Sequence, residues 1–123
     1  MQGTLNDQSL IYLQIAQMIE NDILREVYRA EEQVPSTNAL AKQLNINPAT
    51  AAKGLNLLAA AGILYKKRGL GMFVSAGAAE AIRKKRRATF CDGYVKPMVK
   101  EGRSLGLTAE DILEMVADAM ADM

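Results

Sequence analysis

Two helix starts separated by an asparagine turn constrain the fold of this chain more than any other feature. Ser36 is a favourable N-cap, because its hydroxyl oxygen can accept a hydrogen bond from an unpaired backbone N–H at a helix start. In the segment TNALAKQL (37–44) that follows, one helical face carries Leu40, Ala41 and Leu44. The sequence therefore predicts a short helix over residues 37–44, followed by a turn that contains Asn45 and Asn47.

The second helix of the pair begins within NINPATAAKG (45–54). Asn47 is its expected N-cap, and Pro48 stands at the first helical position, where a missing N–H costs nothing. We expect this helix to run to about Ala61 and to stop at Gly62, with Ala51, Leu55 and Leu58 buried. Small side chains are expected on its exposed surface ahead of Lys53, namely Ala49, Thr50 and Ala52.

The flanking segments complete a known arrangement. Residues 10–27 carry apolar side chains at helical spacing, at Ile11, Ile15, Ile19, Ile23, Leu24 and Val27. After the helix pair, Ile63–Tyr65 and Met72–Val74 are short β-prone runs, and the Lys-Arg-Gly-Leu-Gly between them can form a hairpin turn. This order predicts a mainly α fold, a winged helix-turn-helix of three helices plus a two-stranded β-hairpin.

The composition changes from Ala76 onward. AGAAEAIRKKRRATF favours a basic helix, and Gly93 and Pro97 then interrupt or kink the helical pattern. Thr108 is the expected cap of a last helix, whose apolar face carries Ile112, Leu113, Val116 and Met120. Two helical pieces are too little to bury a core alone. We therefore expect residues 76–123 to be a short two-helix tail that joins two copies into a homodimer, with a dimer core that includes Met98, Met115, Met120 and Met123.

The residue types present argue against catalysis. The chain contains no histidine, so an imidazole base or ligand is excluded, and its scattered Asp and Glu residues show no pattern of a catalytic pair. We expect no enzyme activity, no metal and no cofactor. Cys91 is the only cysteine, so an internal disulfide is impossible, and a small buried side chain is the expectation for it. Tyr94 could line a pocket, with buried packing as the default expectation.

Charge is distributed locally rather than in bulk. The net charge is +1, so any basic surface must come from short runs. Lys66 to Arg68 lie at the predicted hairpin tip. Residues 83–87 point all round a helix, which leaves contact with DNA, with solvent or with a second subunit open. Because polar residues interrupt the N-terminal apolar stretch, we expect no signal peptide, no membrane contact and a cytoplasmic location.

Three stretches together resemble the GntR family of bacterial transcription regulators: IYLQIAQMI, VPSTNALAKQLNINPATAAKGLNLLAAAGILYKKRGLGMFVS and YVKPMVKEGRSLGLTAEDILEMV. The most specific pieces are Pro-Ser at 35–36, Asn-Pro-x-Thr at 47–50 and Gly-x-Gly-x-Phe-Val at 69–74. The short C-terminal part is similar to that of the YtrA-type subfamily. The resemblance implies a regulator, with a repressor as the expectation, that binds double-stranded DNA of inverted-repeat sequence as a homodimer. Residues 1–75 would be the DNA-binding domain and residues 76–123 the dimerisation region.

The resemblance also implies which surface meets DNA, with the second helix of the pair in the major groove and the hairpin wing in the minor groove. Free N–H groups at a helix start suit phosphate or base edges. Many relatives carry arginine at the position of Asn38 and asparagine or arginine at that of Ala49, so a relative's operator sequence does not transfer to this chain. The expected DNA-binding residues are Ser36, Thr37, Asn38, Asn47, Ala49, Thr50, Lys53, Lys67, Arg68, Gly69, Leu70 and Gly71.

Two other classes of function remain open at this point. One is a winged-helix protein-interaction module without DNA binding, which would show no salt-dependent affinity for any duplex. The other is an enzyme with a carboxylate-only site, which would need a cleft of paired acids. An unidentified small-molecule effector is a further expected partner. Its pocket would lie between the DNA-binding and dimerisation parts.

Overall fold

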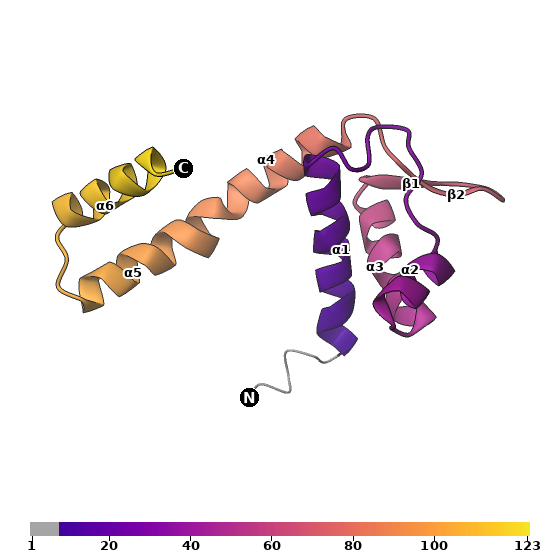
Figure 1. Ribbon diagram of the computed structural model, residues 1–123, viewed down its shortest axis with the longest axis horizontal. Coiled ribbons are helices and arrows are strands. Elements are labelled where there is room, and N and C mark those ends of the chain that lie inside the picture. Colours follow the sequence, from indigo (N-terminus) through magenta and orange to yellow (C-terminus); the bar gives the residue numbers. More distant parts are fainter. Residues whose placement is uncertain (1–7) are drawn as a thin grey trace. The chain divides into compact units, whose positions relative to one another are not determined.

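The computed structural model describes residues 8–123, which form two compact units, one up to Arg83 and one from Lys84 onward. Along the chain the elements are α1 (Gln8–Leu24), α2 (Thr37–Leu44), α3 (Pro48–Ala60), β1 (Leu64–Lys67), β2 (Gly71–Val74), α4 (Ala78–Phe90), the π-helical segment η2 (Cys91–Val95), α5 (Lys96–Ser104) and α6 (Ala109–Ala121) (Figure 1). The predicted winged helix-turn-helix, mainly helical with one antiparallel hairpin, is confirmed.

Helix α1 supplies one wall of the first unit's core. Its residues Ile15, Ile19 and Ile23 are buried against α3 as the spacing predicted. The helix ends at Leu24, however, so the expected end at Val27 is wrong. Glu26 adopts a left-handed conformation with φ of 64°, which a helix cannot continue through, and Val27 is exposed.

The helix pair forms as predicted. Ser36 Oγ accepts a hydrogen bond from the N–H of Ala39 at 3.0 Å and caps α2. Asn47 Oδ1 accepts one from the N–H of Ala49 at 2.8 Å and caps α3. In the turn between them, Asn45 is left-handed with φ of 55°, a conformation that asparagine tolerates. Leu44 departs from expectation, because it is exposed at the end of α2 while Leu40 and Ala41 are buried.

The hairpin carries a third extended segment along one edge. Strands β1 and β2 pair in antiparallel register, with Tyr65 opposite Phe73. The connection between α1 and α2 then pairs with β2, because the N–H of Val34 donates to the carbonyl of Met72 at 3.0 Å. Gln33 forms an isolated bridge with Phe73. The edge of β2 is therefore covered by the chain itself.

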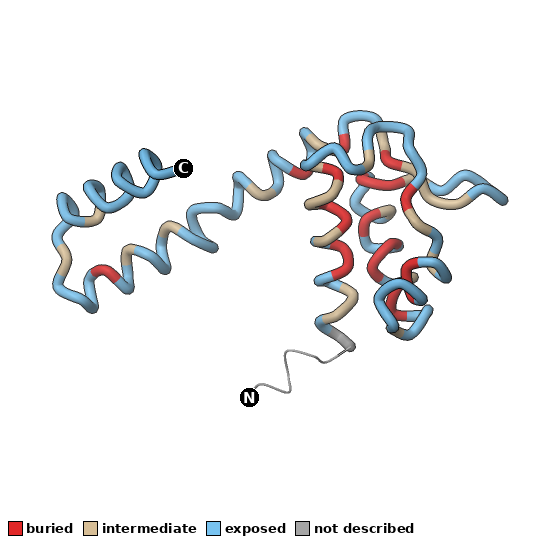
Figure 2. Tube along the Cα trace, viewed as in Figure 1, coloured by how far each residue is buried: buried red, intermediate tan, exposed pale blue. Residues whose placement is uncertain are grey.

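The core of the first unit takes in the start of α4 (Figure 2). Ala78 and Ile82 are 3% and 0% exposed, and both belong to the cluster of buried residues that includes Leu55, Leu58 and Leu64. The first compact unit accordingly extends to Arg83, beyond the residue Ser75 at which the sequence placed the end of the first domain. That boundary remains a functional prediction.

The second unit consists of helical segments, with a turn at residues 105–108 between α5 and α6. The expected interruption near Gly93 and Pro97 takes the form of η2, a stretch of wider π-helical turns directly ahead of α5. Pro97 has no N–H to donate and its ring crowds the preceding turn, so a locally wider helix accommodates it. Thr108 caps α6 in a reciprocal capping box with Asp111.

Two side chains of the second unit are more exposed than the sequence indicated. Cys91, expected to be buried, is exposed. Tyr94, for which buried packing was expected, is 67% exposed and lies beside Phe90 with 5.6 Å between ring centroids. Both expectations are wrong for a single chain, because among residues 84–123 only Gly102 is buried.

Candidate nucleic-acid interface

The starts of α2 and α3 present backbone N–H groups without a competing negative charge. Neither helix has an acidic residue in its first turn. Ser36, Asn38 and Asn47 are exposed, and Thr37 is half-buried. The oxygens of Ser36 and Asn47 are used as caps, which leaves the hydroxyl proton of Ser36 and the amide protons of Asn47 as donors. These two helix starts can therefore accept an anion such as a phosphate.

Helix α3 offers a mixed surface. Ala49 and Lys53 are exposed and Ala52 is half-buried, as expected for a face that meets a ligand. Thr50 is different, because it is only 7% exposed and has an interaction within the protein. The expectation of an exposed Thr50 is wrong. Thr50, three positions after the cap, belongs to the buried side of α3.

The wing places its basic residues around a glycine-dependent turn. Lys67 ends β1, and Arg68, Gly69 and Leu70 form the exposed turn before Gly71. Gly69 and Gly71 have φ of 79° and 118°, conformations that residues with a Cβ rarely adopt. The ammonium of Lys67 lies 4.4 Å from the ring centroid of Phe73. The wing tip is therefore a compact cationic turn with little side-chain bulk around it.

Contacts that the sequence did not predict hold this wing in place. Gln33 Nε2 donates a hydrogen bond to the carbonyl oxygen of Leu70 at 2.6 Å. A Cβ added to Gly71 would lie 2.7 Å from the same Nε2 atom, so glycine is needed for the approach. The hydroxyl of Tyr65 donates a hydrogen bond to Glu31, and this bond raises the pKa of Tyr65 above its ordinary value. Neither Gln33 nor Glu31 could be predicted from the sequence, because the partner of each lies more than 30 positions away along the chain.

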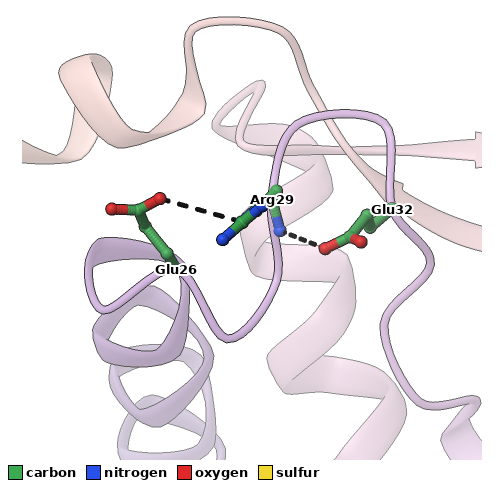
Figure 3. A network of polar contacts seen from close by, with 3 residues as sticks. All are labelled: Glu26, Arg29 and Glu32. Atoms are coloured by element: carbon green, nitrogen blue, oxygen red, sulfur yellow. Dashed lines mark hydrogen bonds and ion pairs between the residues drawn. The ribbon is translucent and has the colours of Figure 1, made fainter.

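A polar network shapes the connection that carries Gln33 (Figure 3). The side chain of Arg29 forms an ion pair with Glu26 at 3.7 Å, and the backbone N–H of Arg29 donates to Glu32 at 2.6 Å. Both ionic groups of the pair are about 70% exposed, so the contact contributes little to stability. Its role is local, since it holds the turn that leads from α1 to the edge of β2.

The described residues of this interface offer hydrogen-bond donors and cations. Among residues 8–123, no three His, Cys, Asp or Glu side chains gather in a group that could hold a metal ion. Within the same range, no helix is both long and apolar enough to cross a bilayer. The side chains of this interface offer hydrogen bonding, charge or close approach to a ligand. Such a surface suits recognition of a phosphate backbone.

Comparison with known proteins also indicates a DNA-binding protein. The sequence model described as "Bacterial regulatory proteins, gntR family" matches residues 11–74. The HTH-type transcriptional regulator YhcF of Bacillus subtilis (strain 168) is 32% identical over 106 residues, which are 85% of this chain and 84% of YhcF. The HTH-type transcriptional repressor YtrA of the same organism is 26% identical over 113 residues, 92% of this chain and 86% of YtrA.

Solved structures agree with these sequence matches. A GntR-family transcriptional regulator from Bacteroides thetaiotaomicron superposes with a TM-score of 0.75 at 31% identity, covering 91% of this chain and 97% of that one. The DNA-binding domain of AraR, solved in complex with an operator, has a TM-score of 0.50 at 28% identity and covers 52% of this chain and 77% of its own. The chain therefore belongs to the GntR family of bacterial transcription regulators, proteins that bind DNA through a winged helix and are not enzymes.

Proposed function

We propose that this protein is a sequence-specific repressor that binds an inverted-repeat operator as a homodimer. The observation that carries the proposal is the pair of helix starts at Ser36 and Asn47, free of acidic residues, on the same unit as a cationic wing. The AraR domain, a relative with the same fold, is solved with an operator. YtrA, which matches nearly the whole chain, is named a repressor.

Each part of the surface has its own role in the proposed complex. The start of α2, with Ser36, Thr37 and Asn38, binds the phosphate backbone and fixes the docking position. The start of α3 enters the major groove, where Ala49 and Ala52 can meet thymine methyl groups and Asn47 can donate to a base edge or phosphate. The wing enters the minor groove through Lys67, Arg68, Gly69, Leu70 and Gly71. Thr50 was also expected to contact DNA, and because it is only 7% exposed we propose that it serves packing within the unit instead.

The second unit supports the homodimer. Its large apolar side chains are mostly exposed in the single chain, including Leu105, Leu113, Met115 and Met120 at 57–71%. An apolar groove between α5 and α6 is lined by residues such as Met98, Leu107 and Val116. Monomers rarely expose so much contiguous apolar surface. A second copy would cover both surfaces at once, and two-fold symmetry in the protein would match an inverted repeat in the DNA.

We keep the proposed division of labour, with DNA binding in residues 1–75 and dimerisation in residues 76–123. The start of α4 adds Ala78 and Ile82 to the core of the DNA-binding unit. A protein that acts on the bacterial chromosome works in the cytoplasm, and we place this one there. For the basic residues 83–87, contact with DNA, with solvent or with a second subunit stays open.

The test of DNA recognition is enrichment of bound duplexes from a randomised pool, followed by affinity measurements on the enriched sequence. We expect the pool to converge on an inverted repeat, with specific binding stronger than binding to a scrambled duplex by about 10³-fold or more. A protein-interaction module would give no convergence and no affinity that falls with salt. Either result is decisive for the proposal.

The test of dimerisation is light scattering at micromolar protein concentration. We expect the mass of two chains, and a stable monomer would refute the homodimer. We expect two copies to associate through the exposed apolar surface of residues 84–123, because a single copy leaves Leu113 and Met120 in water.

We also propose that a small-molecule effector regulates the protein. The sequence favoured a pocket between the two parts of the chain. Within the first unit, an open cavity of about 410 Å³ offers a floor that includes Ile23, Val74 and Ala78, and polar walls that include Arg29 and Arg83. Thermal-shift screening of metabolites, followed by DNA release in a mobility assay, tests regulation by an effector. Hits that leave DNA affinity unchanged would contradict it.

A further inference from the structure

Helices α1 and α3 approach each other unusually closely at Gly54. A Cβ at this position would lie 2.9 Å from Ile15 Cγ2 and 3.0 Å from the carbonyl oxygen of Tyr12. Any side chain at residue 54 would therefore push the helices apart. The close approach brings the neighbouring residue, Lys53, against α1.

The partner of Lys53 on α1 is an aromatic ring. The ammonium nitrogen of Lys53 lies 4.2 Å from the centroid of the Tyr12 ring, within the range of a cation–π contact. Lys53 is exposed, so the ammonium keeps an open side toward solvent, and Tyr12 is half-buried. A free lysine side chain samples many rotamers and loses their entropy on binding. The contact with the ring favours one region of space for this ammonium before any ligand arrives.

The width of the major groove indicates where the Lys53 ammonium lies relative to DNA. The groove is about 12 Å wide, and an α-helix with its side chains has a diameter of about 10–12 Å. If α3 fills the groove, α1 cannot enter it as well. Helix α1 then lies outside the groove, so a side chain held at the α1 side of α3 is nearer to the sugar–phosphate backbone than to the base edges on the groove floor.

We propose that Tyr12 is a positioning residue that holds the Lys53 ammonium at the edge of α3, where it binds a backbone phosphate rather than a base. This inference rests on the proposed DNA-binding function. It assigns Lys53 to affinity and docking and not to sequence discrimination. It also adds α1 to the DNA-binding surface, to which the sequence had assigned only α2, α3 and the wing.

The experiment compares Lys53→Ala, Tyr12→Leu, Tyr12→Phe and the Lys53→Ala/Tyr12→Leu double variant in the full chain. The probes are the duplex enriched from the randomised pool and a scrambled duplex of equal length and composition. We expect Lys53→Ala to weaken binding to both duplexes by a similar factor and to reduce the slope of log affinity against log salt by about 0.9.

The tyrosine variants separate positioning from packing. Tyr12→Leu should weaken binding to both duplexes by about two- to five-fold, the value of one exposed cation–π contact. Tyr12→Phe keeps the ring and should bind like the wild type. In the Lys53→Ala background, Tyr12→Leu should have no further effect, because its only role in binding is to hold Lys53. Thermal unfolding checks each fold, and Tyr12→Met replaces Tyr12→Leu if the latter unfolds.

Three outcomes would overturn the inference. They are unchanged binding by Tyr12→Leu, an equal loss from Tyr12→Leu with and without Lys53, and a Lys53→Ala loss confined to the enriched duplex. The last result would make Lys53 a base contact. Failure of the proposed function is distinguishable, because the wild type itself would then show no salt-dependent affinity for either duplex.

Discussion

The two units of this protein use apolar side chains in opposite ways. In the first unit, the large aliphatic residues of three helices and the hairpin meet one another, and residues such as Ile19, Leu55 and Ile82 are 0–1% exposed. In the second unit, no large apolar side chain is buried, and most are 36–102% exposed, from Val116 to Met123. The first unit therefore has a buried core of its own, whereas the second presents an apolar face that a second copy covers in the homodimer proposed above.

The two units also differ in the charge at their helix starts. Helices α2 and α3 begin with neutral caps and no acidic residue in the first turn. Helix α6 begins with Glu110 and Asp111, and Asp111 closes a capping box with Thr108. The positive end of the α6 dipole is therefore neutralised by its own chain, while those of α2 and α3 remain available to an external anion. The first unit is the one prepared for DNA.

The largest expected effect comes from the core of the first unit. Leu55→Ala should lower the free energy of unfolding by about 2–5 kcal/mol, because Leu55 is 1% exposed and its loss leaves a cavity. Leu57→Ala, two residues along the same helix but 40% exposed, is the matched control and should cost well under about 1 kcal/mol. Urea unfolding monitored by circular dichroism measures both. Equal losses would mean that this core is not the one on which the unit depends.

The next effect concerns the exposed face of the second unit. Leu113→Ala should weaken dimerisation by up to about 1.5–3 kcal/mol, the value of burying a leucine side chain, and should leave the unfolding of the first unit unchanged. Leu113 is 68% exposed in the single chain. Sedimentation at several concentrations measures the dimer affinity. An unchanged affinity would place the interface elsewhere.

A comparable effect is expected at the DNA-binding surface. Arg68→Ala should weaken binding to most duplexes by about 1–3 kcal/mol and flatten the salt dependence, because an exposed cation at the wing tip is lost. Arg25→Ala, an exposed cation just after α1, is the control and should bind like the wild type. Thr50→Ala, once expected on the DNA face, should instead lower stability and keep the salt slope. Fluorescence anisotropy at several salt concentrations checks all three.

The smallest effect is at the start of α6. Hydrogen bonds from the Thr108 backbone and side chain lower the pKa of Asp111 below its ordinary value of 3.8. A lowered carboxyl pKa stabilises the fold above the unfolded pKa, and this contribution is lost as pH falls through the folded pKa. Acidification below pH 3.8 should therefore loosen the start of α6. Amide exchange at residues 109–111 measures this loosening, and Asp111→Asn should remove its pH dependence.

Local chemistry made most of the fold predictable. Caps and turns depend on neighbouring residues, so Ser36, Asn47 and Thr108 predicted three helix starts, and the glycine hairpin predicted the wing. Errors arose where distant packing decides. The end of α1 was placed too late because the left-handed Glu26 has no sequence signal. Cys91 and Tyr94 were expected to be buried because their residue types usually are, yet their neighbourhood offers no cover within one chain.

The DNA-binding interface was likewise predictable where it depends on local sequence. Helix starts and a basic turn are visible in sequence, and the structure places Ser36, Asn38, Asn47, Ala49, Lys53 and Arg68 on exposed positions. Whether Thr50 is buried or exposed depends on how α3 packs. The spacing of apolar residues predicts the buried face of α3 only to within one residue. Tyr12 and Gln33 could not be found from sequence, because each acts through a contact with a residue more than 35 positions away.

The most direct test of the central claim is the salt dependence of duplex binding by the whole wild-type chain. The account predicts that the affinity for the enriched duplex falls linearly on a plot of log affinity against log salt. The slope should correspond to several phosphate contacts, at about 0.9 per contact. A fragment ending after Arg83 keeps Ala78 and Ile82 in the core. It should still bind DNA, but more weakly than the whole chain and with a shallower salt slope. An affinity that is absent, or that does not change with salt, would contradict the claim that the first unit binds DNA.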